Sequence, residues 1–407
     1  MDSRLRQAQL RRLNNVRFKT TMHNCVAFKV MQSRGWTEVF DTDYDWDIFW
    51  ADVHSLGVES NFDHSKLQDH QKLNHFPRHV ELTRKDLMVK NLKRARKALE
   101  KEGRGYEYDF FPQTYVLPLE HGLFVEEFRR NPGITWIMKP CGRAQGRGIF
   151  LLDRLSQVSG WRKDREDKEK PEVYVVSRYL ERPLLVGGKK FDLRIYALVV
   201  SFMPLKVYLH RGGFCRFSSG RYSLDKDNMK NLYMHLTNVA IQKKGENFEQ
   251  TTGMKWPIRN LKLYLMTKFG PAAAHSLFGN IQTVVLRSLL AVQRVITQDK
   301  HCFELYGYDV LIDEDLKPWL IEVNASPSLV TDTPADHKLK FDMVDDALTL
   351  VDVEGKLEGS LPASYGGFDL VWDGSGPVPV HPSLPSMLGT DIPEGRKNRR
   401  LPKPAAP

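Results

Sequence analysis

The sequence predicts an α/β protein of the α+β type, and three features of its patterning carry this prediction. A strand, a helix and a second strand follow one another within residues 16–53. Strand-like segments separated by turns fill much of residues 134–329, and a long helical pattern begins at Pro271. With 407 residues, 41% of them hydrophobic, the chain is long enough for one large globular unit or for two to three domains.

The N-terminal region has the alternation expected of a small α/β domain. Residues 16–20 (VRFKT) and the segment DIFWADV, which ends at Val53, are typical of strands, and a helix is expected between them at about residues 22–33. Residues 54–80 are polar and rich in histidine, without a clean period. We therefore predict a basic extension over residues 1–15 and an α/β domain over residues 16–80.

Residues 81–180 are predicted to form a central domain that opens with a helix. Thr83 and Asp86 resemble a capping box at its start, and Gly103 ends it. Its apolar stripe consists of Leu87, Leu92, Ala95 and Leu99, and its opposite face, interpreted as solvent-exposed, carries Lys90, Lys93, Arg94, Arg96 and Lys97. Residues 162–172 (RKDREDKEKPE) are interpreted as a charged, mobile loop.

The C-terminal half contains the longest helical pattern of the chain. After Pro271, apolar side chains recur at helical spacing and are expected in the core, namely Phe278, Ile281, Val285, Leu289, Val292 and Ile296. We assign residues 181–354 to one domain. From about residue 355 onward, Pro, Gly and Ser accumulate and periodicity disappears, which predicts a disordered tail over residues 355–407 with a basic end between Arg396 and Lys403.

Composition narrows the class of partner only slightly. The chain has 60 basic and 50 acidic residues, a net charge of +10, which is compatible with ATP, nucleic acid, an anionic membrane or an acidic protein tail. The four cysteines (Cys25, Cys141, Cys215 and Cys302) show no zinc-like spacing and are expected to be reduced. The start of the chain does not resemble a signal peptide, and the most apolar stretch is too short for a bilayer. These features predict a soluble intracellular protein.

A candidate phosphate site follows the first strand of the β-rich region. The segment WIMKPCGRAQGRGIF (136–150) is a strand that ends in Lys139, followed by a turn with Gly142, Gly146 and Gly148. A lysine can place a charge on a phosphate, and glycines let backbone N–H groups approach it. A simple hairpin loop has the same pattern, and the segment is neither a P-loop nor a dinucleotide fingerprint. The next strand, YVVSRYL (174–180), could offer backbone groups to adenine, although alone it is more typical of plain structure.

The segment GGKKFDLRIYALVV (187–200) carries polar side chains at strand spacing. Alternate residues of a strand share a face, so Lys190, Asp192 and Arg194 are expected on the same face, together with Tyr196. The other face, formed by Leu193, Ile195 and Ala197, is expected in the core. A surface ladder of ion pairs would fit this pattern. The two adjacent glycines and the upstream loop favour a functional interpretation.

The segment 303–329 predicts a hairpin with a metal site. If Ile312 pairs with Trp319, then Leu311 meets Leu320 and Asp309 lies directly opposite Glu322, which shares its face with Asn324. Two carboxylates and an amide oxygen suit Mg²⁺. Without a cation, two buried carboxylates side by side would be costly. Polar residues scattered on a solvated hairpin would be the alternative.

The order of these motifs resembles the ATP-grasp domain of the tubulin tyrosine ligase-like family, from about Val16 to Val351. The closest stretches are HVELTRKDLMVKNLKR, GGKKFDLRIY, HLTN and LYGYDVLIDEDLKPWLIEVNASPSL. Within the family, the sequence is similar to the glutamate-adding branch. The resemblance implies an ATP-grasp fold with the smaller N-terminal α/β domain, the central domain and a C-terminal catalytic domain over residues 181–354.

The resemblance also implies ATP and Mg²⁺ as cofactors and assigns roles to residues. Those that would contact the nucleotide are Lys139, Gln145, Gly146, Ser177, Arg178, Tyr179, Leu180, Lys190, Phe191, Asp192, Thr237 and Asn238. Asp309, Glu322 and Asn324 would bind the metal, Glu322 and Arg194 would be catalytic, and Arg216, Lys243 and Lys340 would hold the incoming amino acid. Lys85 would reach the γ-phosphate. The family usually has glutamine at the position of Ser177, which puts the side-chain contact to adenine in doubt.

The implied reaction is the joining of free L-glutamate, through its amine, to a γ-carboxylate in the acidic C-terminal tail of tubulin by way of an acylphosphate. It implies a place in the cytoplasm and cytoskeleton, at a ciliary or flagellar axoneme or basal body, without nucleic acid or membrane insertion. Further complex subunits are left open. Two alternatives remain: a non-catalytic microtubule-binding or scaffolding relative, and another ATP-grasp activity such as addition of glycine or tyrosine or phosphorylation of a small molecule. The intact metal ligands argue against the first.

Overall fold

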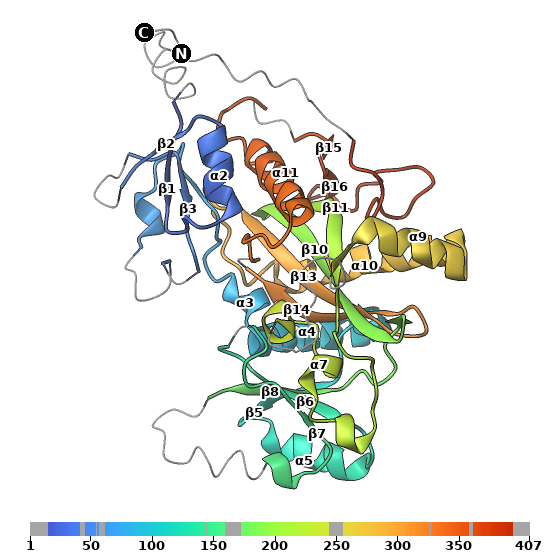
Figure 1. Cartoon of the computed structure of the whole chain (residues 1–407). Helices are drawn as coiled ribbons and strands as arrows, with labels where there is room; N and C mark the ends of the chain where they lie inside the picture. The colour runs from blue at the N-terminus through green and yellow to red at the C-terminus, as the bar shows by residue number, and fades with distance from the viewer. Residues whose placement is uncertain are drawn as a thin grey trace.

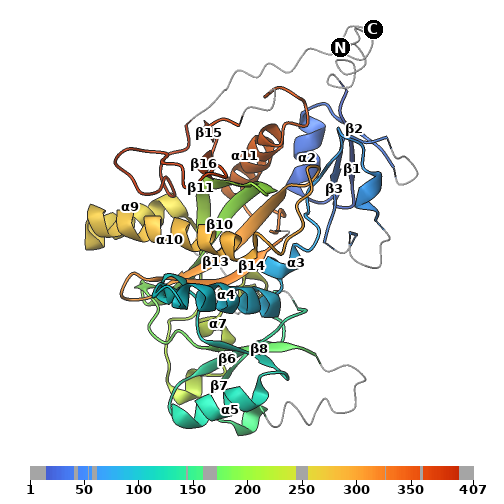
Figure 2. The ribbon, with the colours of Figure 1, turned by 180° about the vertical axis from the view of Figure 1, so that it is seen from behind.

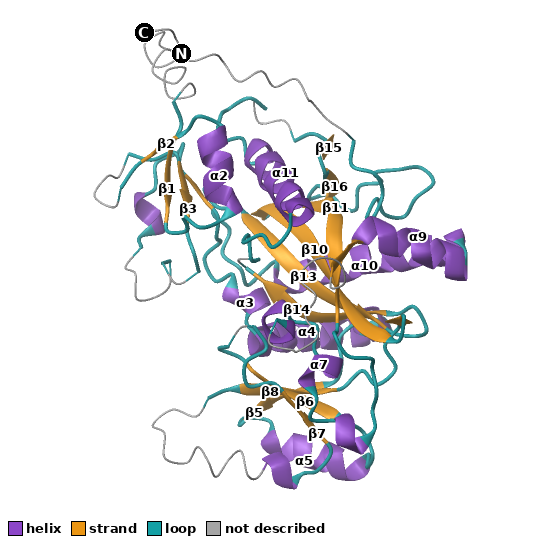
Figure 3. Cartoon of the chain, viewed as in Figure 1, coloured by secondary structure: helices purple, strands orange, loops and turns teal. Residues whose placement is uncertain are grey.

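Three β-sheets organise the part of the chain that the structure describes, and two of them lie on either side of a central helix (Figure 1). The computed structural model describes residues 15–40, 45–53, 55–56, 62–143, 145–158, 172–243, 255–325, 327–357 and 361–393. Helices and strands are both well represented along the chain (Figure 3), which confirms the mixed α/β class. The predicted charged loop over residues 162–172 lies outside the described residues except for Glu172.

The N-terminal sheet is parallel, with the strand order β2-β1-β3-β4. Its strands and its helix are β1 (Arg17–Thr20), α2 (Val26–Ser33), β2 (Thr37–Glu38), β3 (Ile48–Trp50) and β4 (Lys72–Leu73), and a short turn, η2 (His64–Lys66), precedes β4. The predicted strand–helix–strand pattern is therefore present. The strands β2 and β4 were not expected, because two residues are too few for a periodic pattern.

The central helix begins later than the sequence suggests. A short helix, α3 (Val80–Thr83), stops at Arg84, and α4 (Lys85–Glu100) starts anew. The capping-box prediction is wrong, because the Thr83 hydroxyl donates to the His79 carbonyl (3.3 Å) and Asp86 accepts from Arg84 (2.8 Å). Both views show α4 lying between the large sheet and the small sheet (Figure 2).

The small sheet is antiparallel, with the order β5-β8-β6-β7, and it packs against α5 (His121–Arg130). Its strands are β5 (Thr114–Leu117), β6 (Trp136–Pro140), β7 (Phe150–Leu152) and β8 (Tyr174–Arg178), and a 3₁₀ turn, η3 (Gly105–Tyr108), precedes them. Buried aromatic side chains join the helix to the sheet, with the rings of Phe124 and Trp136 5.2 Å apart. The sheet therefore has a hydrophobic core of its own.

The large sheet has the order β14-β13-β10-β11-β16-β15, with β9 and β12 paired to its middle strands. Its strands are β9 (Leu185–Val186), β10 (Lys189–Phe202), β11 (Leu205–Phe217), β12 (Lys255–Pro257), β13 (Glu304–Ile312), β14 (Pro318–Asn324), β15 (Ser364–Tyr365) and β16 (Phe368–Trp372). Three short helical segments follow β11, namely η4 (Lys226–Asn228), α7 (Leu232–His235) and α8 (Val239–Gln242).

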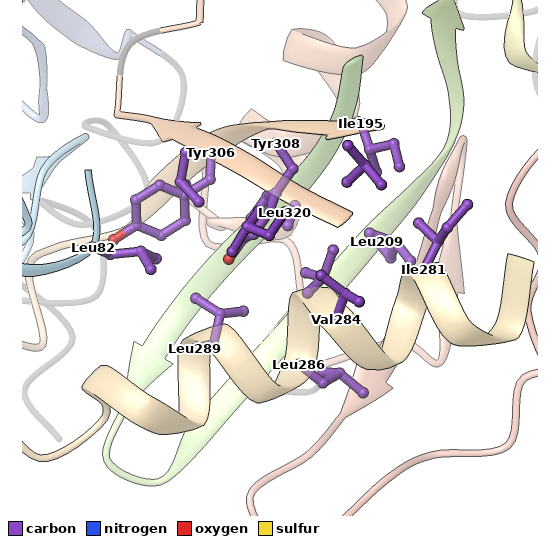
Figure 4. Close-up of a cluster of buried hydrophobic side chains, with 14 of the residues drawn as sticks. Leu82, Ile195, Leu209, Ile281, Val284, Leu286, Leu289, Tyr306, Tyr308 and Leu320 are labelled. Carbon is purple, nitrogen blue, oxygen red and sulfur yellow. The ribbon is translucent and has the colours of Figure 1, made fainter. Parts of the chain in front are cut away.

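Helices cover both faces of the large sheet. One face packs on α10 (Pro271–Val292) and its neighbour α9 (Ile258–Phe269), and the other packs on α11 (Pro334–Leu350) and α2. Figure 4 shows Ile281, Val284 and Leu289 of α10 pointing at strands β10, β13 and β14. The predicted core face of this helix is thereby confirmed. Within the described residues, no helix combines the length and apolarity that crossing a membrane requires.

The C-terminal segment differs from the predicted disordered tail. Residues 361–393 are ordered, and β16 pairs with β11 at the edge of the large sheet. Phe368 is fully buried, and Leu388 packs on the α9–α10 pair, where its carbonyl accepts from Lys262 (2.7 Å). The reason is local, since the apolar strand FDLVW is flanked by glycines and prolines that dominate the composition of the region. The basic end, Arg396 to Lys403, lies outside the described residues.

The docking of this segment can be tested at Phe368, whose ring packs at 4.8 Å from that of His210. We expect Phe368→Ala to lower the free energy of unfolding by about 3–5 kcal/mol, because it leaves a cavity in a closed core. Ile392→Ala, at a position 37% exposed, should stay within about 0.5 kcal/mol. Denaturant unfolding measures both. A disordered tail would instead make both substitutions neutral.

Candidate active site

A cavity of about 540 Å³ lies between the small sheet and the edge of the large sheet. Strands β6 and β8 contribute one wall, and strands β10, β13 and β14 contribute the other. Most of the side chains that the sequence singled out line it: Lys139, Gln145, Gly146, Ser177, Arg178, Tyr179, Leu180, Lys190, Asp192, Thr237, Asn238, Asp309, Glu322 and Asn324. Lys85 lines it as well, from the first turn of α4.

The glycine-rich turn between β6 and β7 packs closely on the segment that contains HLTN. Gln145 and Gly146 both have positive φ angles, 62° and 75°. A Cβ atom on Gly146 would come within 2.4 Å of the Cδ1 atom of Ile241 and 3.2 Å from the Oδ1 atom of Asn238. Glycine is required here both for the backbone conformation and for the close approach. The turn and the segment before α8 therefore form one wall of the cavity.

The backbone after β8 leaves one donor for a ligand. The N–H groups of Arg178 and Tyr179 donate to the carbonyls of Gln113 (2.8 Å) and Thr135 (2.9 Å). Among the described residues, the N–H of Leu180 has no such partner, although Leu180 lines the cavity. A backbone N–H at this edge is what a heterocyclic base would need from the protein.

The Ser177 side chain is not free to take over the role of the glutamine that the family usually has at this position. Its hydroxyl lies 2.8 Å from that of Thr114 on β5, and the side chain is 6% exposed. The hydroxyl is therefore engaged inside the small sheet. Contacts to a base at this place fall to the backbone and to the apolar wall formed by Ile137, Ile149 and Leu311.

Lys190 is held by a buried chain of hydrogen bonds. Its ammonium donates to the Tyr179 hydroxyl (2.9 Å) and to the His235 carbonyl (3.0 Å). The Asn228 carbonyl can only accept, so the His235 Nε2 atom (3.0 Å away) carries the proton. The Nδ1 atom of His235 then accepts from the Tyr179 hydroxyl (3.0 Å). Tyr179 thus supports Lys190 rather than stacking beside a base.

Burial also shifts the pKa values of Lys190 and His235. Burial, reinforced by the charge of Lys139, lowers the pKa of Lys190 to about 7 against the opposing effect of Asp192. Burial also lowers the pKa of His235, which keeps its ring neutral. Sequence reasoning overlooked His235, although it is the first residue of the HLTN motif. Its buried role can be recognised only once Tyr179 is placed beside it.

A row of opposite charges crosses the large sheet beside the cavity. In the strand register, Asp192 faces Arg216, Arg194 faces Asp309, and Asp309 faces Glu322. The Asp309 carboxylate accepts from Arg194 (2.6 and 3.2 Å) and from Arg216 (2.6 Å). Burial alone would raise the pKa of Asp309, but the charges of Arg194 and Arg216 hold it well below its usual range. Asp309 is therefore ionised although it is 2% exposed.

The predicted register of the hairpin is confirmed for Asp309 and Glu322, but it is wrong near the turn. Ile312 pairs with Pro318, and Leu311 pairs with Trp319, one residue away from the expected pairing. A β-bulge at Ile321 then inserts one residue and restores Asp309 opposite Glu322. The bulge also brings Ile321 to the cavity, although the sequence placed it on the opposite face.

The three candidate metal ligands fit a hard divalent cation. Asp309 is ionised, and Glu322 faces it across the hairpin. The side-chain amide of Asn324 donates to the Gly307 carbonyl (3.2 Å), so its Oδ1 atom remains for a ligand. The ammonium of Lys85 lies 3.2 Å from Glu322. Such a set of oxygen atoms is suited to Mg²⁺ bridged to phosphates.

Several predicted residues do not line the cavity. Phe191 belongs to the hydrophobic core, with its ring 5.4 Å from that of Phe217, so its side chain is unsuited to contacting a nucleotide. The guanidinium groups of Arg194 and Arg216 are used in the row of ion pairs. Arg216 therefore contacts Asp192 and Asp309 in this arrangement, and its role in holding an amino acid stays a prediction.

Lys243 and Lys340 lie in a separate cluster with two aspartates and a third lysine. Lys243 pairs with Asp332 (2.7 Å), and Lys340 pairs with Asp336 (3.1 Å). Lys255 bridges both carboxylates (2.9 and 3.2 Å). It also sits opposite Arg216 in the register, which places the cluster next to the row of ion pairs. Sequence reasoning missed Lys255 and both aspartates, because no spacing in the chain connects them.

Comparison with known proteins points to a single protein family. Residues 62–360 match the tubulin-tyrosine ligase family. The chain is 46% identical over 409 residues to "Probable tubulin polyglutamylase TTLL9" of Bos taurus, covering 92% of this chain and 87% of the relative. It is 47% identical over 353 residues to "Probable alpha-tubulin polyglutamylase Ttll1" of Tetrahymena thermophila, covering 83% and 86%. The motifs had also suggested the short paralogue numbered nine, and this prediction is confirmed.

The lowered pKa of Lys190 predicts a pH dependence of nucleotide binding. Below pH 7 the free protein already carries the charge, whereas above pH 7 the amine must take up a proton to face phosphates. The affinity for ATP should therefore fall about tenfold between pH 6 and pH 8. Calorimetry in two buffers would show proton uptake at pH 8. Lys190→Met serves as the control, because it shows the titration of ATP itself. This variant should lose the proton uptake of the protein. Equal slopes of ATP affinity against pH for both proteins would contradict the assignment.

Proposed function

The chain belongs to the tubulin-tyrosine ligase family, and we propose that it is an ATP-dependent tubulin polyglutamylase with an ATP-grasp fold. The observation that carries this proposal is one cavity in which a set of oxygen ligands with an ionised Asp309 faces two lysines and a glycine turn. The relatives that cover most of the chain are themselves named tubulin polyglutamylases. The family and the site therefore support the same class of reaction, a carboxylate–amine ligation.

The nucleotide is held by groups from both sheets in this proposal. Lys139 and Lys190 meet the phosphates, together with N–H groups of the turn at Gly146. The Leu180 N–H and the apolar wall receive the base. Asp309, Glu322 and Asn324 would hold Mg²⁺, which when bound neutralises phosphate charge. Arg194, with its guanidinium on Asp309, keeps that carboxylate ionised and oriented.

The acceptor carboxylate is a poor electrophile, so the reaction must first activate it. Transfer of the γ-phosphoryl group of ATP to the acceptor carboxylate gives an acylphosphate and ADP. The free amine of the incoming amino acid then attacks the acyl carbon and expels phosphate, so that ATP, a carboxylate and an amine become an amide, ADP and phosphate. Lys139, Lys190 and Lys85 surround the place where negative charge is transferred. Positioning and charge stabilisation can supply most of the acceleration.

Glutamate as the incoming amino acid is supported by the lysine cluster. Lys243, Lys255 and Lys340 already hold the carboxylates of Asp332 and Asp336. A donor with two carboxylates requires more than one cation, and these lysines lie beside Arg216 at the end of the row of ion pairs. The acceptor in this proposal is a γ-carboxylate in the acidic C-terminal tail of tubulin.

We propose a cytoskeletal location at microtubules, which the tubulin-modifying activity in the names of the relatives supports. A ciliary or flagellar axoneme or basal body is the more specific location that we propose. The net charge of +10 suits an acidic protein surface.

The decisive experiment supplies the purified chain with microtubules, ATP and Mg²⁺, and with radiolabelled glutamate, glycine or tyrosine in separate reactions. Label in tubulin with glutamate alone supports the proposal. Label with glycine or tyrosine would assign another donor. If no label appears, the assay is repeated with the cell extract that supports polyglutamylation, before and after the chain is depleted. An extract unaffected by depletion would show that the chain is not the ligase.

Loss of one metal ligand should stop the reaction without unfolding the protein. We expect Glu322→Gln to lower glutamate incorporation by at least about a hundredfold, because the cavity loses a charged oxygen ligand. Glu314→Gln is the matched control, since Glu314 lies on the exposed turn of the same hairpin. Circular dichroism should be unchanged in both variants. Wild-type turnover by Glu322→Gln would exclude this metal assignment.

A further inference from the structure

A second group of metal-ligand side chains lies outside the active site. His64 belongs to η2, while Asp299 and Cys302 directly precede β13. Backbone bonds join the neighbouring strand β4 to the segment before β13, because Leu73 donates to the His301 carbonyl (2.8 Å) and Phe303 donates to the Leu73 carbonyl (3.0 Å). The group therefore sits where the N-terminal sheet meets the strand that carries Asp309.

The spacing of the three ligand atoms matches a tetrahedral ion. The Nδ1 atom of His64 lies 3.3 Å from the Oδ2 atom of Asp299 and 3.9 Å from the Sγ atom of Cys302. All three atoms lie within 4.8 Å of one another. With Zn–N and Zn–O bonds of about 2.0 Å and a Zn–S bond of about 2.3 Å, tetrahedral angles give an N···O separation of about 3.3 Å and an N···S separation of about 3.5 Å. Small side-chain shifts would complete the site.

The remaining contacts of Asp299 orient it for this role. Its Oδ1 atom accepts from the backbone N–H of His301 (2.9 Å) and lies 2.8 Å from the Nδ1 atom of the same residue. The Oδ2 atom is left facing His64. Ligating carboxylates in proteins are commonly fixed by such outer hydrogen bonds.

A neighbouring group shows what a purely structural arrangement looks like. His75, His79 and Glu304 also gather three ligand types and are buried. There, however, the Nδ1 atom of His75 lies only 2.7 Å from Glu304, a hydrogen-bond distance too short for two ligands of one ion. Glu304 also accepts from the backbone of Phe76 (3.0 Å). We therefore interpret His75 and Glu304 as a hydrogen-bonded pair and not as two ligands of one ion.

We propose that His64, Asp299 and Cys302 bind one Zn²⁺ ion, or a similar transition-metal ion, with solvent in the fourth position. The side chain of His64 is 27% exposed, which leaves a route for the ion and for water. The Cys302 thiol gives up its proton on binding, so that one thiolate and one carboxylate balance the two charges of the ion. A neutral complex limits the cost of burial beside Lys72 and Glu304.

The ion would act as a cross-link between distant parts of the chain. It would tie η2 to the beginning of β13, whose other half carries Asp309. Burial raises the pKa of the Cys302 thiol, so without the ion the thiol stays protonated. Binding therefore replaces a weak sulfur contact between η2 and the segment before β13 with metal–ligand bonds.

Cobalt provides the test, because a Co²⁺–thiolate bond gives a charge-transfer band in the near ultraviolet. The full-length protein is stripped with chelator and titrated with Co²⁺ in excess Mg²⁺ and ATP, which occupy the oxygen-ligand site. We expect about one equivalent of Co²⁺ with the thiolate band, displaced by Zn²⁺, and a higher thermal midpoint with either ion.

Two cysteine variants separate the site from other thiols. Cys302→Ser should lose the band, whereas Cys25→Ser should keep it, because Cys25 is equally buried and its thiol donates to the Met22 carbonyl (3.0 Å). Asp299→Asn should weaken binding at least tenfold while keeping the band at saturation. Wild-type protein without the band, or a band that survives Cys302→Ser, overturns the proposal irrespective of whether the variants fold.

Discussion

The arrangement depends on one buried carboxylate, Asp309, held between two arginines. An ionised aspartate at 2% exposure is stable only because Arg194 and Arg216 contact it directly. Buried ion pairs of this kind contribute little net stability compared with apolar side chains of the same size. Their use here is to keep a negative charge at the cavity wall. The order and register of β11, β10, β13 and β14 serve that purpose, since a shift by one residue would turn the charges to the opposite face.

The opposite wall of the cavity buries lysines instead of carboxylates. Burial lowers the pKa of both Lys139 and Lys190, and the charge of Lys139 lowers the pKa of Lys190 further, so this wall favours a negatively charged ligand. A bound polyanion would supply negative charge beside the two lysines. The Tyr179–His235 pair holds Lys190 in place until then, because each hydrogen bond in the chain has a fixed direction. Binding energy is thereby available for ordering the phosphates rather than for moving the lysine.

Much of the site could be predicted because strand alternation is a local rule. The faces of β10 follow from period two alone, whereas the opposition of Asp309 and Glu322 also depends on a bulge. The bulge at Ile321 could not be predicted, because it is decided by packing on both sides of the strand. The cluster around Lys255 joins three lysines from different elements, a contact that no spacing in the sequence records. The C-terminal strand was overlooked because regional composition outweighed five residues of good strand pattern.

The C-terminal strand has a consequence for behaviour in a crowded solution. Without β16, the long strand β11 would present a row of unpaired N–H and C=O groups to any other chain. With it, the outermost strand at that side is β15, which is only two residues long. Such a short edge offers almost no template for pairing between molecules. The segment after residue 361 therefore acts as a guard against aggregation, in a protein that we propose works on a densely repeating polymer.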